Sequence, residues 1–199
     1  MASTGAVRAL GRLWWRTPDP VALMDRLRRE GIEPHGGVLA LGPLVFRIVA
    51  GPTDQLAVDD APADHEGAAV APGWAALAIA WATVDVARAV AGIGALPVDR
   101  RPRDATLGAS VTLVPGRPVP VALLEPDTEG RLAAMLARHG EGPVGVYAVR
   151  AAEPGAVFGD PGPFGPQRLL ARATAPWAPV LLQVEPPRSG VAGTATIRP

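Results

Sequence analysis

The side chains that could do chemistry are a set of arginines, a tryptophan and two carboxylates at strand ends. Arg8, Arg12 and Trp14 fall two or four residues apart in the segment AVRALGRLWW, and such spacing on a strand places side chains on one face. Asp59 ends the segment QLAVD, and Glu125 ends VALLE. A guanidinium pairs with carboxylate, phosphate or enolate, an indole offers a stacking surface, and a buried carboxylate can act as a general base. The set predicts a site for an anionic or aromatic molecule, with Glu125 and Asp59 as candidate acid/base residues.

The segment around this tryptophan has a second copy further along the chain. WWRTPD and AWATVD share the pattern W-x-T-x-D at an offset of 66 residues. The same offset relates four further pairs: Leu41 and Leu107, Gly42 and Gly108, Val45 and Val111, Asp59 and Glu125. A single match of this kind arises easily by chance in a chain rich in alanine, valine and glycine. Several coincidences at one offset favour duplication, with chance as the alternative.

Both copies predict the same local structure, which is a strand followed by an Asp-capped helix. Asp19-Pro20 is a typical helix start, and Gly31 ends the helix. Asp85 plays the same part after ALAIAWATV, and apolar residues then recur at helical spacing. Each unit is predicted to run strand–helix–strand–strand–strand, an α+β fold class of tandem βαβββ modules.

The predicted units divide the chain into four parts. The first module covers residues 5–60, a linker of Pro/Gly-rich composition covers 61–73, and the second module covers 74–126. Residues 127–199 are predicted to hold a helix capped by Asp127, with Leu132, Met135 and Leu136 inward, followed by C-terminal strands. The stretch EPGAVFGDPGPFGP is a predicted loop where the repeat would need a helix. This last part is therefore a degenerate third module.

The tandem βαβββ pattern resembles the vicinal oxygen chelate superfamily, the group of glyoxalase I, bleomycin-resistance proteins and extradiol dioxygenases. The run VALLEPDTEGRLAAMLARHGEGPVGVYAV looks like the common glyoxalase-like stretch of strand, helix and strand, and DPGPFGPQRLL is similar to the loop and strand that come after that stretch. The resemblance implies that two modules pair into a curled sheet, a cup, with the site inside. It also implies dimerisation.

Metal-using members of this superfamily place His or Gln on the first strand of a module and Glu near the end of its last strand. The matching first-strand positions here are Arg12, Ala78 and Val144, none of which ligates a metal. The carboxylate positions Asp59 and Glu125 are kept, with Glu185 near the end of the third segment. We therefore expect no conventional metal site and no cofactor, with Mg²⁺ held by carboxylates and water as the alternative. The three histidines are interpreted as exposed or capping residues.

Strand alternation assigns the faces of the first strands. Leu13 and Trp15 are expected to pack on the helices together with Trp81. Arg12 and Trp14 then lie on the concave face, and so does Ala78, one of a run of alanines that would leave room for a ligand. The same concave side of the cup is expected to receive the side chains of Asp59, Leu123 and Glu125. The alternative is that Arg12 forms a structural ion pair with Asp59 or Glu125.

Composition limits the function classes. The chain of 199 residues has 19 basic and 19 acidic residues, so its net charge gives no argument for nucleic acid. It has no cysteine, and all its basic residues are arginine, which excludes thiolate and lysine Schiff-base chemistry. The apolar stretch 74–84 is too short to span a bilayer. We expect a bacterial, cytoplasmic protein without a membrane or nucleic-acid partner, forming a homodimer.

Three functions remain open from the sequence. The first is a metal-independent protein that binds a small molecule in the cup. The second is an enzyme of the same fold, a lyase, isomerase or cyclase that uses Glu125 or Asp59 with Arg12 as electrostatic partner. The third is a structural or interaction domain whose ancestral site has filled in.

Overall fold

A computed structural model describes residues 12–59, 71–93, 99–151, 156–170 and 175–187. Within them, the side chains at positions 12, 59, 93 and 99 are outside the description. The helices are α1 (Pro20–Arg29), α2 (Val86–Ile93) and α3 (Arg131–His139). The strands are β1 (Arg12–Thr17), β2 (Val38–Leu41), β3 (Leu44–Ala50), β4 (Gln55–Asp59), β5 (Trp74–Ala82), β6 (Asp99–Asp104), β7 (Ala109–Val114), β8 (Val121–Pro126), β9 (Gly142–Arg150), β10 (Asp160–Gly162), β11 (Gly165–Leu170) and β12 (Val180–Val184).

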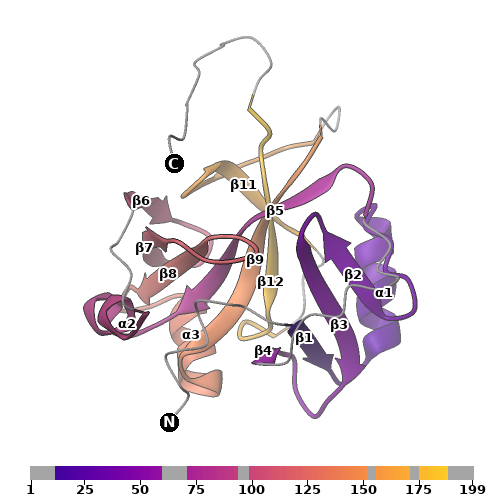
Figure 1. Cartoon of the computed structure of the whole chain (residues 1–199), viewed down its shortest axis with the longest axis horizontal. Coiled ribbons are helices and arrows are strands. Elements are labelled where there is room, and N and C mark those ends of the chain that lie inside the picture. The colour runs from indigo at the N-terminus through magenta and orange to yellow at the C-terminus, as the bar shows by residue number, and fades with distance from the viewer. Residues whose placement is uncertain (1–11, 60–70, 94–98, 152–155, 171–174, 188–199) are drawn as a thin grey trace.

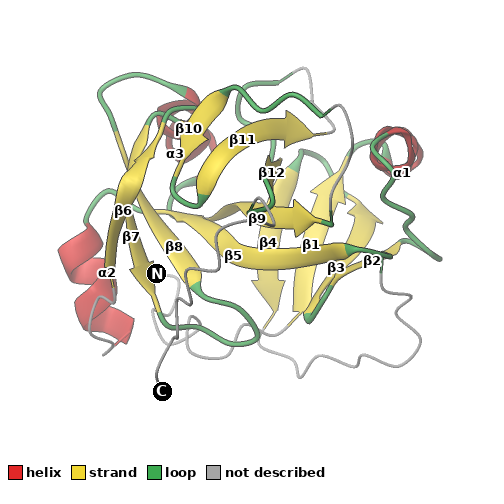
Figure 2. Ribbon diagram, turned by 90° about the horizontal axis from the view of Figure 1, so that it is seen from above, coloured by secondary structure: helices red, strands yellow, loops and turns green. Residues whose placement is uncertain are grey.

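Eight of these strands form one strongly curled mixed sheet in the order β10-β11-β12-β9-β5-β8-β7-β6. It consists of two sets of four, β5–β8 and β9–β12. In each set the first strand runs parallel to the last, and the remaining two continue outward as antiparallel neighbours. The first strands, β5 and β9, pair antiparallel at the centre. Figure 2 shows how this sheet wraps round an interior.

The remaining four strands form a separate sheet in the order β2-β3-β1-β4. Here β1 lies between β3, to which it is parallel, and β4, to which it is antiparallel. Figure 1 shows this sheet, in indigo to purple, beside the curled sheet, with α1 at its outer side. The predicted α+β class with curled βαβββ modules is confirmed, but the modules that share the curled sheet are the second and the third. This corrects the expectation that the first and second modules enclose one cup.

The W-x-T-x-D segments have the same local structure in both places. The Asp19 carboxylate accepts from the amide of Ala22 at 2.9 Å, and the Asp85 carboxylate accepts from the amide of Arg88 at 2.8 Å. Both threonines of the pattern are 2% exposed. In each copy a strand is therefore followed directly by an Asp-capped helix, as predicted.

Beyond the helices the two copies differ in strand pairing. β4, which ends at Asp59, runs antiparallel to β1, whereas β8, which contains Glu125, runs parallel to β5. The strand of the first unit that runs parallel to its first strand is β3. The 66-residue offset therefore aligns Asp59 with a residue that has a different place in its sheet.

One apolar cluster joins the two sheets. Leu13, Trp15 and Phe46 of the four-stranded sheet pack in the same cluster as Ile79 and Leu123 of the curled sheet. Both α1 and α2 contribute to it: Leu23 and Leu27 of α1 are fully buried, and three α2 residues pack on its edge. The prediction that Leu13 and Trp15 face the helices and the core is confirmed, because they are 0% and 5% exposed.

The third helix fits its predicted apolar face but not its predicted cap. Leu132 and Met135 are fully buried, and Gly140 ends the helix with a φ of 73°. The N-cap is Gly130, without a side-chain bond. Asp127 instead pairs with Arg103. The carboxylate that local spacing assigned to the helix instead pairs with an arginine on β6, two strands away in the sheet.

Candidate functional site

The two edges of the curled sheet meet and are held by polar contacts. The amide of Ala105, just after β6, donates to the carbonyl of Pro161 in β10 at 3.1 Å. The hydroxyl of Thr106 donates to the Asp160 carboxylate at 3.1 Å, and the Gln167 amide donates to Thr106 at the same distance. The mouth that an open cup would have between its edges is therefore closed here.

Asp104, at the end of β6, is the centre of this closure. It is fully buried, and its two oxygens accept from the Tyr147 hydroxyl at 2.6 Å, the Gln167 amide at 3.0 Å and the Leu107 amide at 2.8 Å. Burial and the neighbouring Asp104 carboxylate raise the pKa of Tyr147 well above its ordinary value. The phenol therefore stays protonated and remains a donor. Phe164 packs edge-on against the Tyr147 ring at 5.1 Å.

The interior of the curled sheet is filled by side chains. Ala78 and its alternating neighbours Ala80 and Ala82 are all 0% exposed. They pack in one cluster with Tyr147, and with apolar side chains of α3. This corrects the expectation that the alanines leave open room, because aromatic and helical side chains from other elements occupy the space.

The positions implied for a divalent metal do not fit one. In the two paired modules these are Ala78 and Val144 on the first strands, Glu125 on β8 and Glu185 directly after β12. Ala78 and Val144 are apolar and buried in the interior cluster. Glu125 alternates with Leu124, which belongs to that cluster, so its side chain is on the other face of β8. Within the described ranges, no group of three His, Asp or Glu residues is placed to hold a metal ion.

The remaining predicted site residues fall on both sheets. Trp14 is on β1 of the four-stranded sheet, with Ala57 opposite it on β4. Leu123 is fully buried in the cluster between the sheets, on the face of β8 away from Ala78. The register sets Arg12 directly opposite Asp59, but their side chains are outside the description, as is all of Arg8.

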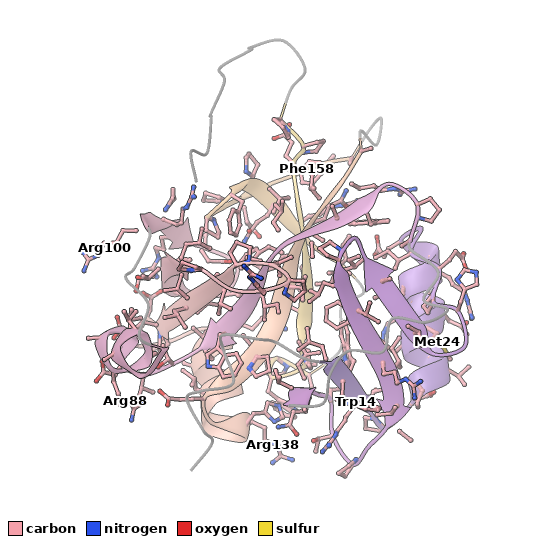
Figure 3. All side chains as sticks on the ribbon, in the orientation of Figure 1. Trp14, Met24, Arg88, Arg100, Arg138 and Phe158 are labelled. Atoms are coloured by element: carbon pink, nitrogen blue, oxygen red, sulfur yellow. The ribbon has the colours of Figure 1, made fainter. Side chains whose placement is uncertain are left out.

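Trp14 is a predicted site residue that borders an open space. A hollow of about 640 Å³ on the four-stranded sheet is lined by Trp14, Arg16, Val49, Ala50, Ala57 and Val58. The guanidinium of Arg47, on the neighbouring strand β3, lies 5.8 Å from the centre of the Trp14 ring. Figure 3 labels Trp14 low on this sheet, on the other side of the view from Arg88 and Arg100. The hollow thus combines an indole, one arginine and small apolar walls, and a second arginine contacts the indole.

The strand arrangement decides the fold. Two four-stranded sets, each with its first strand parallel to its last, are joined through their first strands into one curled sheet. The chain has the vicinal oxygen chelate fold. Within this fold the four-stranded sheet is an addition, and it carries the hollow.

The chain is similar to several solved structures, all at low sequence identity. A hypothetical protein from Bacillus halodurans C-125 matches with a TM-score of 0.45 and 15% identity, over 59% of this chain and 98% of that one. Methylmalonyl-CoA epimerase from Mycobacterium tuberculosis matches with a TM-score of 0.45 and 14% identity, over 56% of this chain and 87% of that one. A glyoxalase I mutant from Zea mays matches with a TM-score of 0.34 and 11% identity, over 90% of this chain and 69% of that one. No family model and no curated protein sequence matches the chain.

Sequence reasoning missed, as site residues, the polar residues of the closure, Arg16 in the hollow and Arg47 beside Trp14. Arg16 shares the face of Trp14 by simple alternation, so its signal was present. Arg47 and Asp104 carry no such signal, because they lie on strands whose neighbours are set by the fold.

In the parts of the chain that the structure describes, no helix is long and apolar enough to cross a bilayer.

Proposed function

We propose that the protein binds a small molecule, an anionic or aromatic metabolite, without the divalent metal usual for the vicinal oxygen chelate fold. The observation that supports this is the hollow beside Trp14. A partly exposed indole next to apolar walls is a surface on which a flat ring can stack. The site lies on the four-stranded sheet, not in the cup.

The filled interior of the curled sheet supports this location. Its alanines and Tyr147 are fully buried, so a ligand there would have to displace packed side chains at a cost of several kcal/mol. The hollow on the four-stranded sheet needs no such displacement. Glu125 lies on the other sheet from Arg12, so the acid/base alternative is confined to Asp59, which is opposite Arg12 in the strand register.

The test uses 2-naphthol as an uncharged flat probe and equilibrium dialysis as the measurement. We expect one bound probe per chain, with affinity reduced about tenfold by Trp14→Ala, since loss of a stacking partner costs about 1–3 kcal/mol. Ala57→Leu should fill the hollow while keeping Trp14, and should weaken binding to a similar extent. Trp177→Ala is the matched control, because Trp177 is exposed but lines no part of the hollow.

Two results would contradict this function. One is the absence of any saturable probe binding to the folded chain. The other is binding that Trp14→Ala and Ala57→Leu leave unchanged while thermal unfolding shows both variants to be folded.

A further inference from the structure

Two exposed arginines stand at the hollow, and the proposed function does not explain them. Arg16 lines the hollow directly, and Arg47 reaches the Trp14 ring from β3. Arg16 is two residues beyond Trp14 on β1, and Arg47 is opposite Trp14 on the parallel neighbour. Strand spacing and rise put their Cα atoms about 8 Å apart. Two guanidinium groups on long stems can converge on one anionic group at this separation.

The cross-strand neighbours of these arginines are uncharged. Arg16 lies opposite Val49 on β3 and Gln55 on β4. Arg47 lies opposite Trp14 on β1 and Val38 on β2. Within the described part of the chain, the structure gives neither arginine an ion pair. Their positive charge is therefore available to a ligand.

One neighbouring residue bears on the path of each arginine stem. A Cβ on Gly51 would lie 2.9 Å from the Cβ of Arg16, which is closer than two such atoms approach each other. Glycine at this position therefore leaves the space that the Arg16 side chain occupies. Arg47 is oriented by its contact with the Trp14 ring. Pre-positioned cations lose less freedom on binding than free ones.

The rest of the hollow is apolar. Its walls are Val49, Ala50, Ala57 and Val58, and none of these side chains can pair with a second charge on the ligand. We propose, resting on the function proposed above, that Arg16 and Arg47 select a ligand with a flat apolar body and a single anionic group. Guanidinium binds carboxylate and phosphate by the same paired hydrogen bonds, so this chemistry covers both groups.

The test compares three probes with one ring system: uncharged 2-naphthol, 2-naphthoate and 2-naphthyl phosphate. We expect at least one anionic probe to bind ten times more tightly than 2-naphthol at low salt, and to lose most of that advantage at high salt. The ratio between naphthoate and naphthyl phosphate then identifies the anionic group.

Variants separate the two arginines from general electrostatics. Arg16→Gln and Arg47→Gln should each weaken anionic probe binding about tenfold, a larger factor than the loss of 2-naphthol binding in the same variant. Arg100→Gln is the matched control, because Arg100 is exposed on β6 of the other sheet. Gly51→Ala keeps every charge but displaces the Arg16 stem, so it should reproduce part of the Arg16→Gln effect.

The outcomes distinguish this inference from the function beneath it. If 2-naphthol binds in a Trp14-dependent way but the anionic probes bind no more tightly, or if the two Gln variants behave like Arg100→Gln, the selectivity for an anion is refuted and the binding function stands. If no probe binds, both fail.

Discussion

Tyr147 is the only tyrosine of the chain, and its hydroxyl donates to buried Asp104 at 2.6 Å. Its pKa is raised well above 10.0, first by burial and then by the Asp104 charge. A raised folded-state pKa means that the contribution to stability is complete below about pH 10. It is lost as the pH rises towards the folded-state pKa.

We therefore expect no phenolate absorbance in an alkaline titration until the chain unfolds. Tyr147→Phe should lower the free energy of unfolding by about 1–3 kcal/mol, because it leaves a buried carboxylate short of a donor. Ultraviolet titration and denaturant unfolding measure the two effects. A phenol that titrates near pH 10 in the folded protein would show that the contact with Asp104 is open in solution.

A second residue-scale prediction concerns Gly162 on β10. A Cβ built there would lie 2.0 Å from the side-chain oxygen of buried Gln167. Gly162→Ala should therefore push Gln167 away from Asp104 and cost about 1–3 kcal/mol in chemical denaturation. Gly159→Ala is the matched control, since a Cβ at that position meets no atom within 4 Å. Equal stability of the two variants would mean that β10 does not pack on Gln167.

At the scale of elements, the start of α2 is held by a residue from another part of the chain. Glu141, next to β9, accepts from the Thr83 hydroxyl and the Val84 amide, both at 2.8 Å, and from Arg88 at 2.7 Å. Chiefly the Val84 amide bond lowers the pKa of Glu141 below 4.5. The carboxylate thus ties the second W-x-T-x-D segment to the central strand pair.

Glu141→Gln should cost about 1 kcal/mol near neutral pH, the usual size of a lost helix cap. Because the folded-state pKa is lowered, this contribution is present above pH 4.5 and disappears as the pH falls through the lower folded-state value. The difference between wild type and variant should therefore shrink in acid, as measured by urea unfolding at several pH values. Glu129→Gln, at an exposed position, is the matched control.

At the scale of the whole molecule, the two sheets share one apolar cluster. Unfolding of either sheet alone would expose that cluster, so we expect a single cooperative transition. Leu13→Ala in the four-stranded sheet and Leu182→Ala inside the curled sheet remove fully buried side chains. Each should cost about 2–5 kcal/mol.

Both variants should shift the same transition, seen alike by tryptophan fluorescence and far-ultraviolet circular dichroism. Two separated transitions, with Leu13→Ala moving only one of them, would show that the sheets unfold independently.

Strand alternation also predicted the separate roles of two adjacent tryptophans. Trp15 is buried in the core, and Trp14 borders the hollow. This succeeded because the face of a strand residue depends only on backbone geometry. Alternation could not predict which residues of other strands lie beside Trp14. The residues expected beside Trp14 included Ala78 and Leu123, and the structure places beside it Arg16, Arg47 and Ala57.

The sequence by itself determined the local structure: the Asp-capped helices after each W-x-T-x-D, the α+β class and the inward face of α3. These follow from capping, periodicity and steric rules that act within a few residues. Only the tertiary structure decided which modules share the curled sheet, that its interior is closed through Asp104, and that the open hollow lies on the other sheet. Strand pairing joins residues far apart in the chain, and its choice depends on burying the whole apolar surface at once.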